Sequence, residues 1–234
     1  MNDSIQVISD NRIDGDSMAI DYSKINSKKI VYRIIKRLFD IVVSVIGLIF
    51  LLPIAIIVKI AYVISGDYKS IFFTQKRIGL NGKEFTFYKF RTMIPNADEE
   101  LVKILDSDPA RKEEYRINKK LKNDPRITKV GNILRKTSLD ELPQVFNIFL
   151  GEMACIGNRP YLPREKQDMG VYYNVIVSTK PGLTGYWQVH GRNDVTFERR
   201  LELETYYSKH CGLKMDIGIF FKTFKVVLFG RGAE

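Results

Sequence analysis

The sequence predicts a mostly helical α+β protein that attaches to a membrane. Three observations lead to this fold class. The 18 residues from Ile41 to Val58 contain no charged side chain, which is close to the minimum for a membrane helix. Farther along, apolar runs flank Asn81-Gly82, as in a β-hairpin. Most of the remaining chain is charged and amphipathic, which indicates helices, some of them at the membrane interface.

Composition limits the chain to one ordinary domain and indicates anionic partners. The 234 residues are 45% hydrophobic, enough for one real core. The net charge of +10 suits nucleic acid, anionic lipid or phosphorylated small molecules. No nucleic-acid-binding motif is present, so nucleic acid is not an expected partner. Cys155 and Cys211 form no zinc or disulfide pattern, which favours a reduced, cytosolic environment.

The N-terminal region divides into a tail and a membrane segment. Residues 1–30 are polar without a sustained period, which predicts a mobile cytosolic tail. Residues 31–66 are expected to form a membrane-embedded helical hairpin. The uncharged run would be roughly 27 Å long as a straight helix, slightly shorter than a hydrocarbon core of about 30 Å. Pro53 cannot donate a hydrogen bond to the carbonyl of Ile49, which predicts a helix–break–helix.

Charges on both sides of this segment favour a re-entrant course. Basic residues precede it and also follow it from Lys59 onward, whereas a spanning helix concentrates them on the cytoplasmic side. We expect the helix to dip into one leaflet and return at Pro53, with Asp40 paired to Lys36 or Arg37. The alternative is a short spanning helix that tolerates the proline.

Residues 67–234 are predicted to form the cytosolic domain, which begins with the hairpin around Asn81-Gly82. Its second strand leads into Lys89 and Arg91, so cationic groups emerge at a strand end where they can meet a phosphate.

Residues 95–122 are highly charged and predict one or two solvated helices. Within them, Asp106-Ser107-Asp108 is the D-x-D arrangement by which many nucleotide-sugar glycosyltransferases hold a divalent metal. The triplet is short and common, and Pro109 follows directly, which favours a turn between two helices. A metal-dependent, membrane-associated glycosyltransferase that releases UDP is therefore the alternative function. A membrane-tethered basic scaffold would need only the charge.

Two adjacent carboxylates, Asp140 and Glu141, lie in a basic stretch from Arg135 to Pro160. Ser138 to Glu141 matches a capping box, but Pro143 would then delete a backbone hydrogen bond at the fifth helical position. A helix that starts at Asp140 places this proline in the first turn. We therefore expect the two acids at a helix entrance, where phosphates are attracted.

The surroundings of the acid pair suggest phosphoryl chemistry. Arg135 and Arg159 supply bidentate donors for phosphate oxygens. In such a basic setting, one carboxylate could act as a nucleophile and the other as a ligand of a hard cation such as Mg²⁺.

The C-terminal third contains a loop and two amphipathic helices. Lys180 to Gly185 is expected to be an ordered loop that continues through Trp187 to Arg192, and such loops suit recognition of a nucleotide or sugar. A turn between packed segments is the other reading. Residues 195–212 predict a charged helix packed on the core, and residues 213–230 predict an amphipathic helix on the membrane surface.

Five motifs occur in order along the chain: KRLFDIVVSVIGLIFLLP, QKRIGLNGKEFTFYKFRTM, DPRITKVGNILRKTSLDELPQVFNIFLGEM, NRP and KPGLTGYWQVHGRN. In this order and spacing, the chain resembles the bacterial sugar transferases, the monotopic polyprenol-phosphate phosphoglycosyl transferases. The resemblance covers the chain from about residue 32 to its end.

The resemblance implies an enzyme on the cytoplasmic face of the bacterial inner membrane. Such an enzyme moves a sugar-1-phosphate from a UDP-sugar to undecaprenyl phosphate and releases UMP. This is the first membrane step in the assembly of exopolysaccharide, capsule, O-antigen or glycoprotein glycans. The implied partners are the UDP-sugar, undecaprenyl phosphate and the membrane, the implied cofactor is Mg²⁺, and a homodimer is compatible with this reading. The segment GRNDVTFERRLELETYY is closer to members that use galactose or glucose phosphate.

The resemblance also implies roles for single residues. Asp140 would be the nucleophile that forms a covalent phosphosugar intermediate, and Glu141 would help to hold Mg²⁺. The residues expected to bind substrate phosphates and neighbouring groups are Lys89, Arg91, Arg135, Gln144, Arg159 and Arg192.

Two positions depart from the family pattern. The family usually has Gly-Pro-Arg-Pro, where this chain has Asn158 in place of the first proline. The helix-breaking proline often follows serine, where this chain has Leu52.

Overall fold

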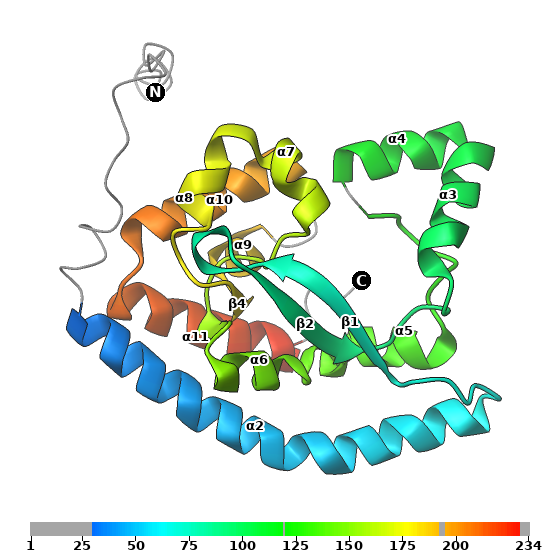
Figure 1. Ribbon diagram of the computed structural model, residues 1–234, viewed down its shortest axis with the longest axis horizontal. Helices are drawn as coiled ribbons and strands as arrows, with labels where there is room; N and C mark the ends of the chain where they lie inside the picture. Colours follow the sequence, from blue (N-terminus) through cyan, green and yellow to red (C-terminus); the bar gives the residue numbers. More distant parts are fainter. Residues whose placement is uncertain (1–29, 119, 192–194, 230–234) are drawn as a thin grey trace.

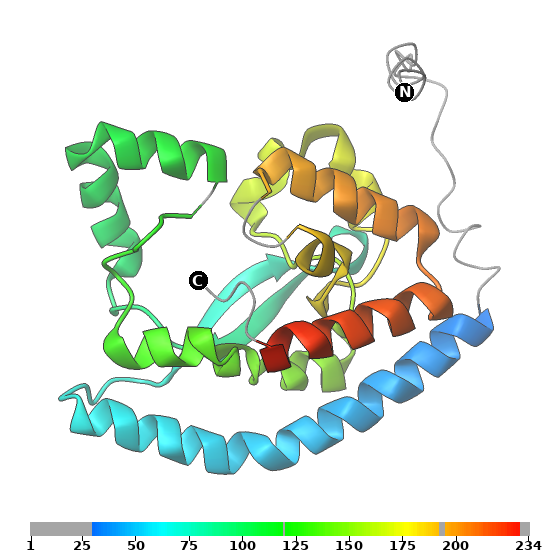
Figure 2. The ribbon, with the colours of Figure 1, turned by 180° about the vertical axis from the view of Figure 1, so that it is seen from behind.

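The computed structural model describes residues 30–118, 120–191 and 195–229, which form a mostly helical α+β fold (Figure 1). The first helix, α2 (Ile30–Ile64), is an arc, and the other elements lie on its concave side (Figures 1 and 2). Of the predicted tail, residues 1–29 lie outside the described residues, and Ile30 is the first residue of α2.

The remaining elements are short. The strands are β1 (Phe72–Ile78), β2 (Glu84–Phe90), β3 (Ala154–Ile156) and β4 (Gly182–Thr184). The α-helices are α3 (Ala97–Ser107), α4 (Pro109–Asn118), α5 (Lys129–Lys136), α6 (Gln144–Leu150), α7 (Lys166–Met169), α8 (Tyr173–Ile176), α9 (Tyr186–His190), α10 (Phe197–His210) and α11 (Leu213–Phe229). The 3-10 turns are η1 (Leu80–Gly82), η2 (Leu139–Glu141), η3 (Pro163–Glu165) and η4 (Gly170–Tyr172).

Helix α2 is continuous over 35 residues, so the predicted break at Pro53 is wrong. The proline costs the helix one backbone hydrogen bond, but packing on both sides of it holds the helix together. On one side, Gly47 lies so close to α6 that a Cβ there would be 2.7 Å from Val145 Cγ1. On the other side, Val58 and Tyr62 are buried in the core. The helix therefore curves where the sequence predicted a hairpin (Figures 1 and 2).

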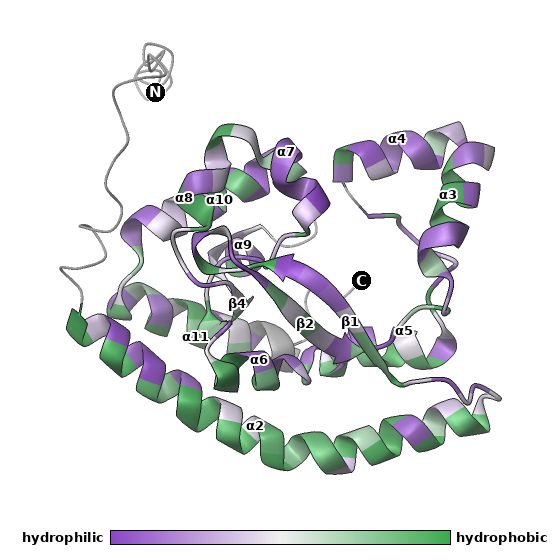
Figure 3. Cartoon of the chain, in the orientation of Figure 1, coloured by the Kyte–Doolittle hydropathy of each residue, from purple (hydrophilic) through white to green (hydrophobic). Residues whose placement is uncertain are grey.

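Most of α2 is hydrophobic, with its hydrophilic residues concentrated in the first half (Figure 3). Among the described residues, α2 is the helix that is long and apolar enough to cross a membrane, by length and composition. Its exposed side chains include Ile34, Leu38, Ile49 and Leu52, which are between 55% and 69% exposed. An apolar surface of this size indicates association with a membrane.

The inner face of α2 is polar near its start and bonds to the domain. Asp40, predicted to pair with Lys36 or Arg37, instead accepts a hydrogen bond from the backbone N–H of Cys155 at 2.8 Å. The partners of the two cations are elsewhere: Lys36 pairs with Asp216 at 2.5 Å, and Arg37 donates to carbonyls at the end of α6. Partners distant in the chain thus replace the expected pairing within the helix.

Strands β1 and β2 confirm the predicted hairpin, with pairing from Phe72↔Phe90 to Ile78↔Glu84. At their connection, Asn81 and Gly82 have φ values of 56° and 79°, which these two residue types adopt readily. Strands β3 and β4 form a second, parallel pair. The loop expected from Lys180 to Gly185 is therefore wrong for Gly182–Thr184, because the partner that makes this segment a strand lies far away in the sequence.

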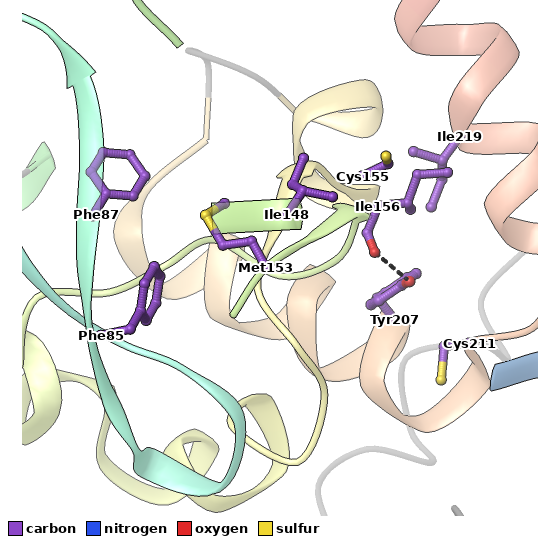
Figure 4. Close-up of a cluster of buried hydrophobic side chains, with 9 residues drawn as sticks. All are labelled: Phe85, Phe87, Ile148, Met153, Cys155, Ile156, Tyr207, Cys211 and Ile219. Carbon is purple, nitrogen blue, oxygen red and sulfur yellow. Dashed lines mark hydrogen bonds between the residues drawn. The ribbon is translucent and has the colours of Figure 1, made fainter. Parts of the chain in front are cut away.

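The main core joins the hairpin to the C-terminal helices (Figure 4). Its buried residues are Phe85, Phe87, Ile148, Met153, Cys155, Ile156, Tyr207, Cys211 and Ile219. They come from β2, α6, β3, α10 and α11 and, for Met153 and Cys211, from the connections between them. Ile148 and Met153 lie between the two phenylalanines and the residues of the C-terminal helices. This cluster places the elements that flank the acid pair.

The charged segment at residues 95–122 forms α3 and α4, which stand apart from the main body (Figures 1 and 2). Asp108 lies at the junction of the two helices, as expected for a turn, and its carboxylate accepts the N–H groups of Ala110 and Arg111. The side chain of Asp106 is exposed. The second aspartate of the D-x-D triplet therefore caps a helix.

Replacing Gly131 with alanine is expected to destabilise the protein by about 2 kcal/mol or more, because overpacked sites cost this much. A Cβ at this position of α5 would lie 1.9 Å from the carbonyl oxygen of Thr92. The melting temperature in detergent measures the effect. The matched control is Asn132→Ala, on an exposed neighbour in the same helix, which should leave the melting temperature nearly unchanged. Equal melting temperatures for the two variants would contradict the close approach.

Candidate active site

The acid pair lies in η2, a 3-10 turn that connects α5 to α6. The predicted helix start at Asp140 is wrong, since α6 begins at Gln144 and Pro143 is its N-cap residue. Pro143 has no N–H to donate, and the turns around it close through shorter bonds such as Leu142 N–H to Leu139 O at 3.1 Å. Asp140 and Glu141 therefore lie directly before the helix.

Ser138 does not cap a helix, in agreement with the rejection of the capping box. Its φ of 56° puts it in the left-handed region, and its side chain makes no capping hydrogen bond. The chain thus turns sharply between α5 and the acid pair.

Three cations from separate elements act on the acid pair. Lys89 comes from β2, Arg135 from α5 and Arg159 from the segment after β3. Burial raises the pKa of Asp140, and the charges of Lys89 and Arg135 partly oppose this rise. Arg135 is oriented by a hydrogen bond from its Nε to Thr92 Oγ1 at 3.0 Å. The structure thus brings together five of the residues that the sequence singled out.

Glu141 is the more strongly perturbed acid. Burial raises its pKa to about 7, and the neighbouring charge of Asp140 adds to the rise, whereas Arg159 and Lys89 oppose it. Burial also lowers the pKa of Lys89 to about 8, with repulsion from Arg135 adding to the effect. Both groups therefore titrate close to neutral pH, which is typical of groups that handle protons or bind charged ligands.

The other predicted site residues lie in different settings. Arg91 is buried and pairs with Asp67 at 2.9 Å, and its Nε donates to the carbonyl oxygen of Ser70. These contacts make it a structural tie between the end of α2 and the hairpin, which argues against phosphate binding. Gln144 is buried at the first residue of α6. Arg192 lies outside the described residues.

A group of buried charges behind Arg159 was missed by the sequence reasoning. Glu204 of α10 is fully buried, accepts the backbone N–H of Arg159 at 2.8 Å, and has a pKa raised to about 7 by burial. Arg77 of β1 donates to the carbonyl oxygen of Pro160 at 2.9 Å. Burial lowers the pKa of Arg77 to about 9, and Arg159 repels it further. The sequence did contain one indication of this group. Arg200 and Glu204 are charged residues four positions apart, which places them on the same face of a predicted helix, and that face is buried.

Asn158 positions the backbone next to Arg159. Its side-chain amide donates to Ile176 O, Thr179 Oγ1 and Ser208 Oγ at distances from 2.6 to 3.1 Å. These bonds tie the segment after β3 to α8 and α10. Hydrogen bonds therefore supply the rigidity that a proline ring gives at the corresponding position of the family pattern.

The acid pair fits Mg²⁺ only together with a substrate. Among the described residues, no group of three or more His, Cys, Asp or Glu side chains forms a metal site. Mg²⁺ usually binds through one or two carboxylates together with substrate phosphates and water. Two adjacent carboxylates near the cations Lys89, Arg135 and Arg159 match the protein's part of this donor set.

Comparisons with known proteins agree with the resemblance. The sequence model of the family described as "Bacterial sugar transferase" matches residues 31–230. Exopolysaccharide production protein ExoY of Sinorhizobium fredii is 43% identical over 198 residues, which cover 85% of this chain and 87% of that protein. Undecaprenyl-phosphate galactose phosphotransferase of Salmonella typhimurium is 44% identical over 201 residues, 86% of this chain and 42% of that protein.

A more distant relative is the UDP-glucose:undecaprenyl-phosphate glucose-1-phosphate transferase of Escherichia coli. It is 33% identical over 201 residues, which cover 82% of this chain and 40% of that protein. The chain therefore spans most of the exopolysaccharide protein and less than half of the two named transferases.

Replacing Glu141 with glutamine is expected to stabilise the metal-free protein at pH 8. The pKa is about 7 in the folded state and about 4.3 in an unfolded chain, so the free energy of unfolding falls as pH rises between these values. Glutamine has no charge at any pH, so the variant does not lose stability as the pH rises. The melting temperature at pH 8 should therefore rise by about 3 °C or more, with little difference at pH 4, below the pKa of the unfolded chain.

Scanning calorimetry in detergent at both pH values checks this expectation. Glu84→Gln, which neutralises an exposed carboxylate at the start of β2, is the control and should not change the pH dependence. A Glu141→Gln protein that melts at the wild-type temperature at pH 8 would show that this carboxyl is well solvated.

Proposed function

The chain belongs to the bacterial sugar transferase family, and we propose that it transfers a sugar-1-phosphate from a UDP-sugar to undecaprenyl phosphate. The observation that carries the proposal is the acid pair of η2, surrounded by Lys89, Arg135 and Arg159. The names of two relatives, a galactose phosphotransferase and a glucose-1-phosphate transferase, support galactose or glucose as the sugar. The name of a third supports a role in exopolysaccharide production.

Asp140 is the proposed nucleophile. Its carboxylate attacks the phosphorus that carries the sugar, the bond between that phosphorus and the bridging oxygen breaks, and UMP leaves. A phosphate oxygen of undecaprenyl phosphate then attacks the aspartyl phosphosugar and releases Asp140. The raised pKa of this carboxyl supports the assignment, since a more basic carboxylate is the better nucleophile once it is ionised.

The neighbouring residues bind and orient the phosphates. Arg135 and Arg159 offer donors to the phosphoryl oxygens, and Lys89 adds a point charge beside both acids. When bound, Mg²⁺ would be held by Glu141 and the diphosphate oxygens and would offset their negative charge. Glu204 and Asn158 keep the backbone of Arg159 in place.

We further propose that α2 lies in one leaflet, with both of its ends on the cytoplasmic face. Its contacts with the domain run from Lys36, paired with Asp216, to Tyr62, which bonds to Arg91 O. This stretch is about 39 Å long at about 1.5 Å per residue, more than a hydrocarbon core of about 30 Å. A helix crossing the bilayer upright would draw polar parts of the domain into the hydrocarbon.

Exposed aromatic residues outside α2 support the same placement. Phe146 and Phe149 of α6 and Phe220, Phe221 and Phe224 of α11 are between 39% and 66% exposed. Phe220 also contacts Phe39 of α2 edge to face, with ring centroids 5.6 Å apart. A polyprenyl chain costs about 0.8 kcal/mol per CH₂ to remove from the bilayer, so a site next to this apolar surface suits a lipid substrate.

Replacing Asp140 with asparagine is expected to abolish UMP release and the covalent intermediate, because the amide is not a nucleophile. The assay uses purified protein, undecaprenyl phosphate, Mg²⁺ and a panel of UDP-sugars, with UMP and UDP quantified separately. Intact mass after incubation with UDP-sugar alone detects the phosphosugar adduct. We expect a loss of about 10³-fold or more, in line with removal of catalytic nucleophiles.

Asp106→Asn is the control, since this exposed carboxylate belongs to the D-x-D triplet and should be dispensable. UDP as the product, together with inactivation by Asp106→Asn, would establish the alternative glycosyltransferase. Undiminished turnover in Asp140→Asn would remove the nucleophile assignment.

Cysteines introduced at Asp10 and at Glu99 are expected to lie on the same side of the membrane, because α2 is proposed to return to the face it enters. A membrane-impermeant maleimide should label neither position in intact spheroplasts and both after lysis. The native Cys155 and Cys211 are buried and should give little background. Labelling of one position alone in spheroplasts would establish a spanning helix.

A further inference from the structure

A cavity of about 560 Å³ lies between the first turns of α2 and the domain. It is lined by residues from α2, the hairpin turn and the segment before β4, including Arg33, Lys36, Arg37, Asn81 and Lys180. Its volume is in the range of small-molecule binding sites.

This cavity is separate from the acid pair. Asn81, at the turn of the hairpin, lines the cavity, whereas Lys89, near the other end of β2, acts on Asp140 and Glu141. Strand residues rise about 3.3 Å each, which places the two sites roughly 20 Å apart. A ligand here would therefore not be bound by the acid pair.

The cavity is lined by more basic side chains than the nearby carboxylates can neutralise. Lys36 pairs with Asp216, and the lining carboxylate of Asp40 is used by the N–H of Cys155. In the part of the chain that the structure describes, neither Arg33 nor Lys180 has an ion-pair partner. The ammonium of Lys180 is partly buried, and burial together with repulsion from Arg37 and Lys36 lowers its pKa, while the charge of Asp40 partly opposes this. An anion would relieve this repulsion.

The surroundings connect the cavity to the membrane-facing surface. It lies on the inner face of the same turns of α2 whose outer face carries the exposed Ile34 and Leu38. A helix with its side chains is about 10 Å across, so the cations lie about one helix diameter from the lipid-facing side. Apolar lining from Leu80, Ala154 and Ile156 suits the glycerol and first methylenes of a lipid.

We propose that this cavity binds the phosphate headgroup of an anionic phospholipid, with Arg33 and Lys180 as its counter-charges. The bound lipid would strengthen the contact between α2 and the domain, because the cavity is lined by both. The proposal rests on the membrane placement given above and does not depend on the transfer reaction.

The test compares the full-length protein in phosphatidylcholine nanodiscs with and without phosphatidylglycerol. Phosphatidylglycerol should raise the melting temperature, and native mass spectrometry should detect a retained phosphatidylglycerol adduct. In Arg33→Gln/Lys180→Gln, both effects should be lost, with affinity for this lipid reduced about tenfold or more. In Arg33→Lys/Lys180→Arg, which keeps both charges, they should persist.

The charge-matched control is Lys112→Gln/Lys209→Gln, on exposed residues of α4 and α10. It should retain the lipid adduct and the stabilisation. Equal loss in the control would show general attraction to an anionic surface and overturn the proposal. Stabilisation by phosphatidylglycerol that persists in the Arg33→Gln/Lys180→Gln protein would also overturn it.

Two competition experiments distinguish the sources of phosphate. Inorganic phosphate that displaces the adduct at millimolar concentration would assign the cavity to a free anion. Undecaprenyl phosphate that displaces it would assign the cavity to the polyprenyl substrate. Either result overturns the phospholipid assignment. UMP release in detergent without phospholipid should be unchanged in the Arg33→Gln/Lys180→Gln protein, so failure of this proposal is distinguishable from failure of the proposed reaction.

Discussion

One buried carboxylate joins the membrane helix to the rest of the protein. Asp216 of α11 is 6% exposed and is bonded by Lys36 and Tyr32 of α2 and by Tyr207 of α10. A buried charge is stable only when it is paired and hydrogen-bonded, so this contact strongly constrains how α2 sits on the domain. Tyr207 also reaches the carbonyl oxygen of Ile156, which links the same group to the parallel strands (Figure 4). The core, the curved helix and the segment that carries Arg159 are held together around this point.

Burial also sets the chemistry of the acid pair. The surroundings that desolvate Glu141 raise its pKa to about 7, and those that desolvate Lys89 lower its pKa to about 8. Opposite charges in water would show almost no such shift, because solvent screens them. In the proposed reaction, an anionic substrate and a cation would bind beside these groups and offset the cost of burying them. Glu204, which accepts the backbone N–H of Arg159, fixes the position of the chain segment that carries this cation.

Much of the fold could be predicted because its signals are local. Asn81-Gly82 marks the hairpin turn, and Asp108-Pro109 marks the junction of α3 and α4. The periodicity of the last two helices needs only a few turns of sequence to be recognised. The sequence also predicted that the acid pair lies at the start of a helix. The predicted first residue was Asp140, whereas the α-helix begins at Gln144, directly after Pro143. The grouping of adjacent carboxylates with Arg135 and Arg159 could be expected from residue types and their nearness in the chain.

The sequence by itself determined most of the elements, the apolar length of α2 and the residue types available at the acid pair. Only the tertiary structure decided how they are used. It kept α2 continuous through Pro53, made Gly182–Thr184 a strand, and committed Arg91 to Asp67. It also brought Glu204 behind Arg159 and gave Asn158 its three hydrogen bonds. The physical reason is that each of these outcomes depends on a partner from another element, and local periodicity carries no information about which distant groups will meet.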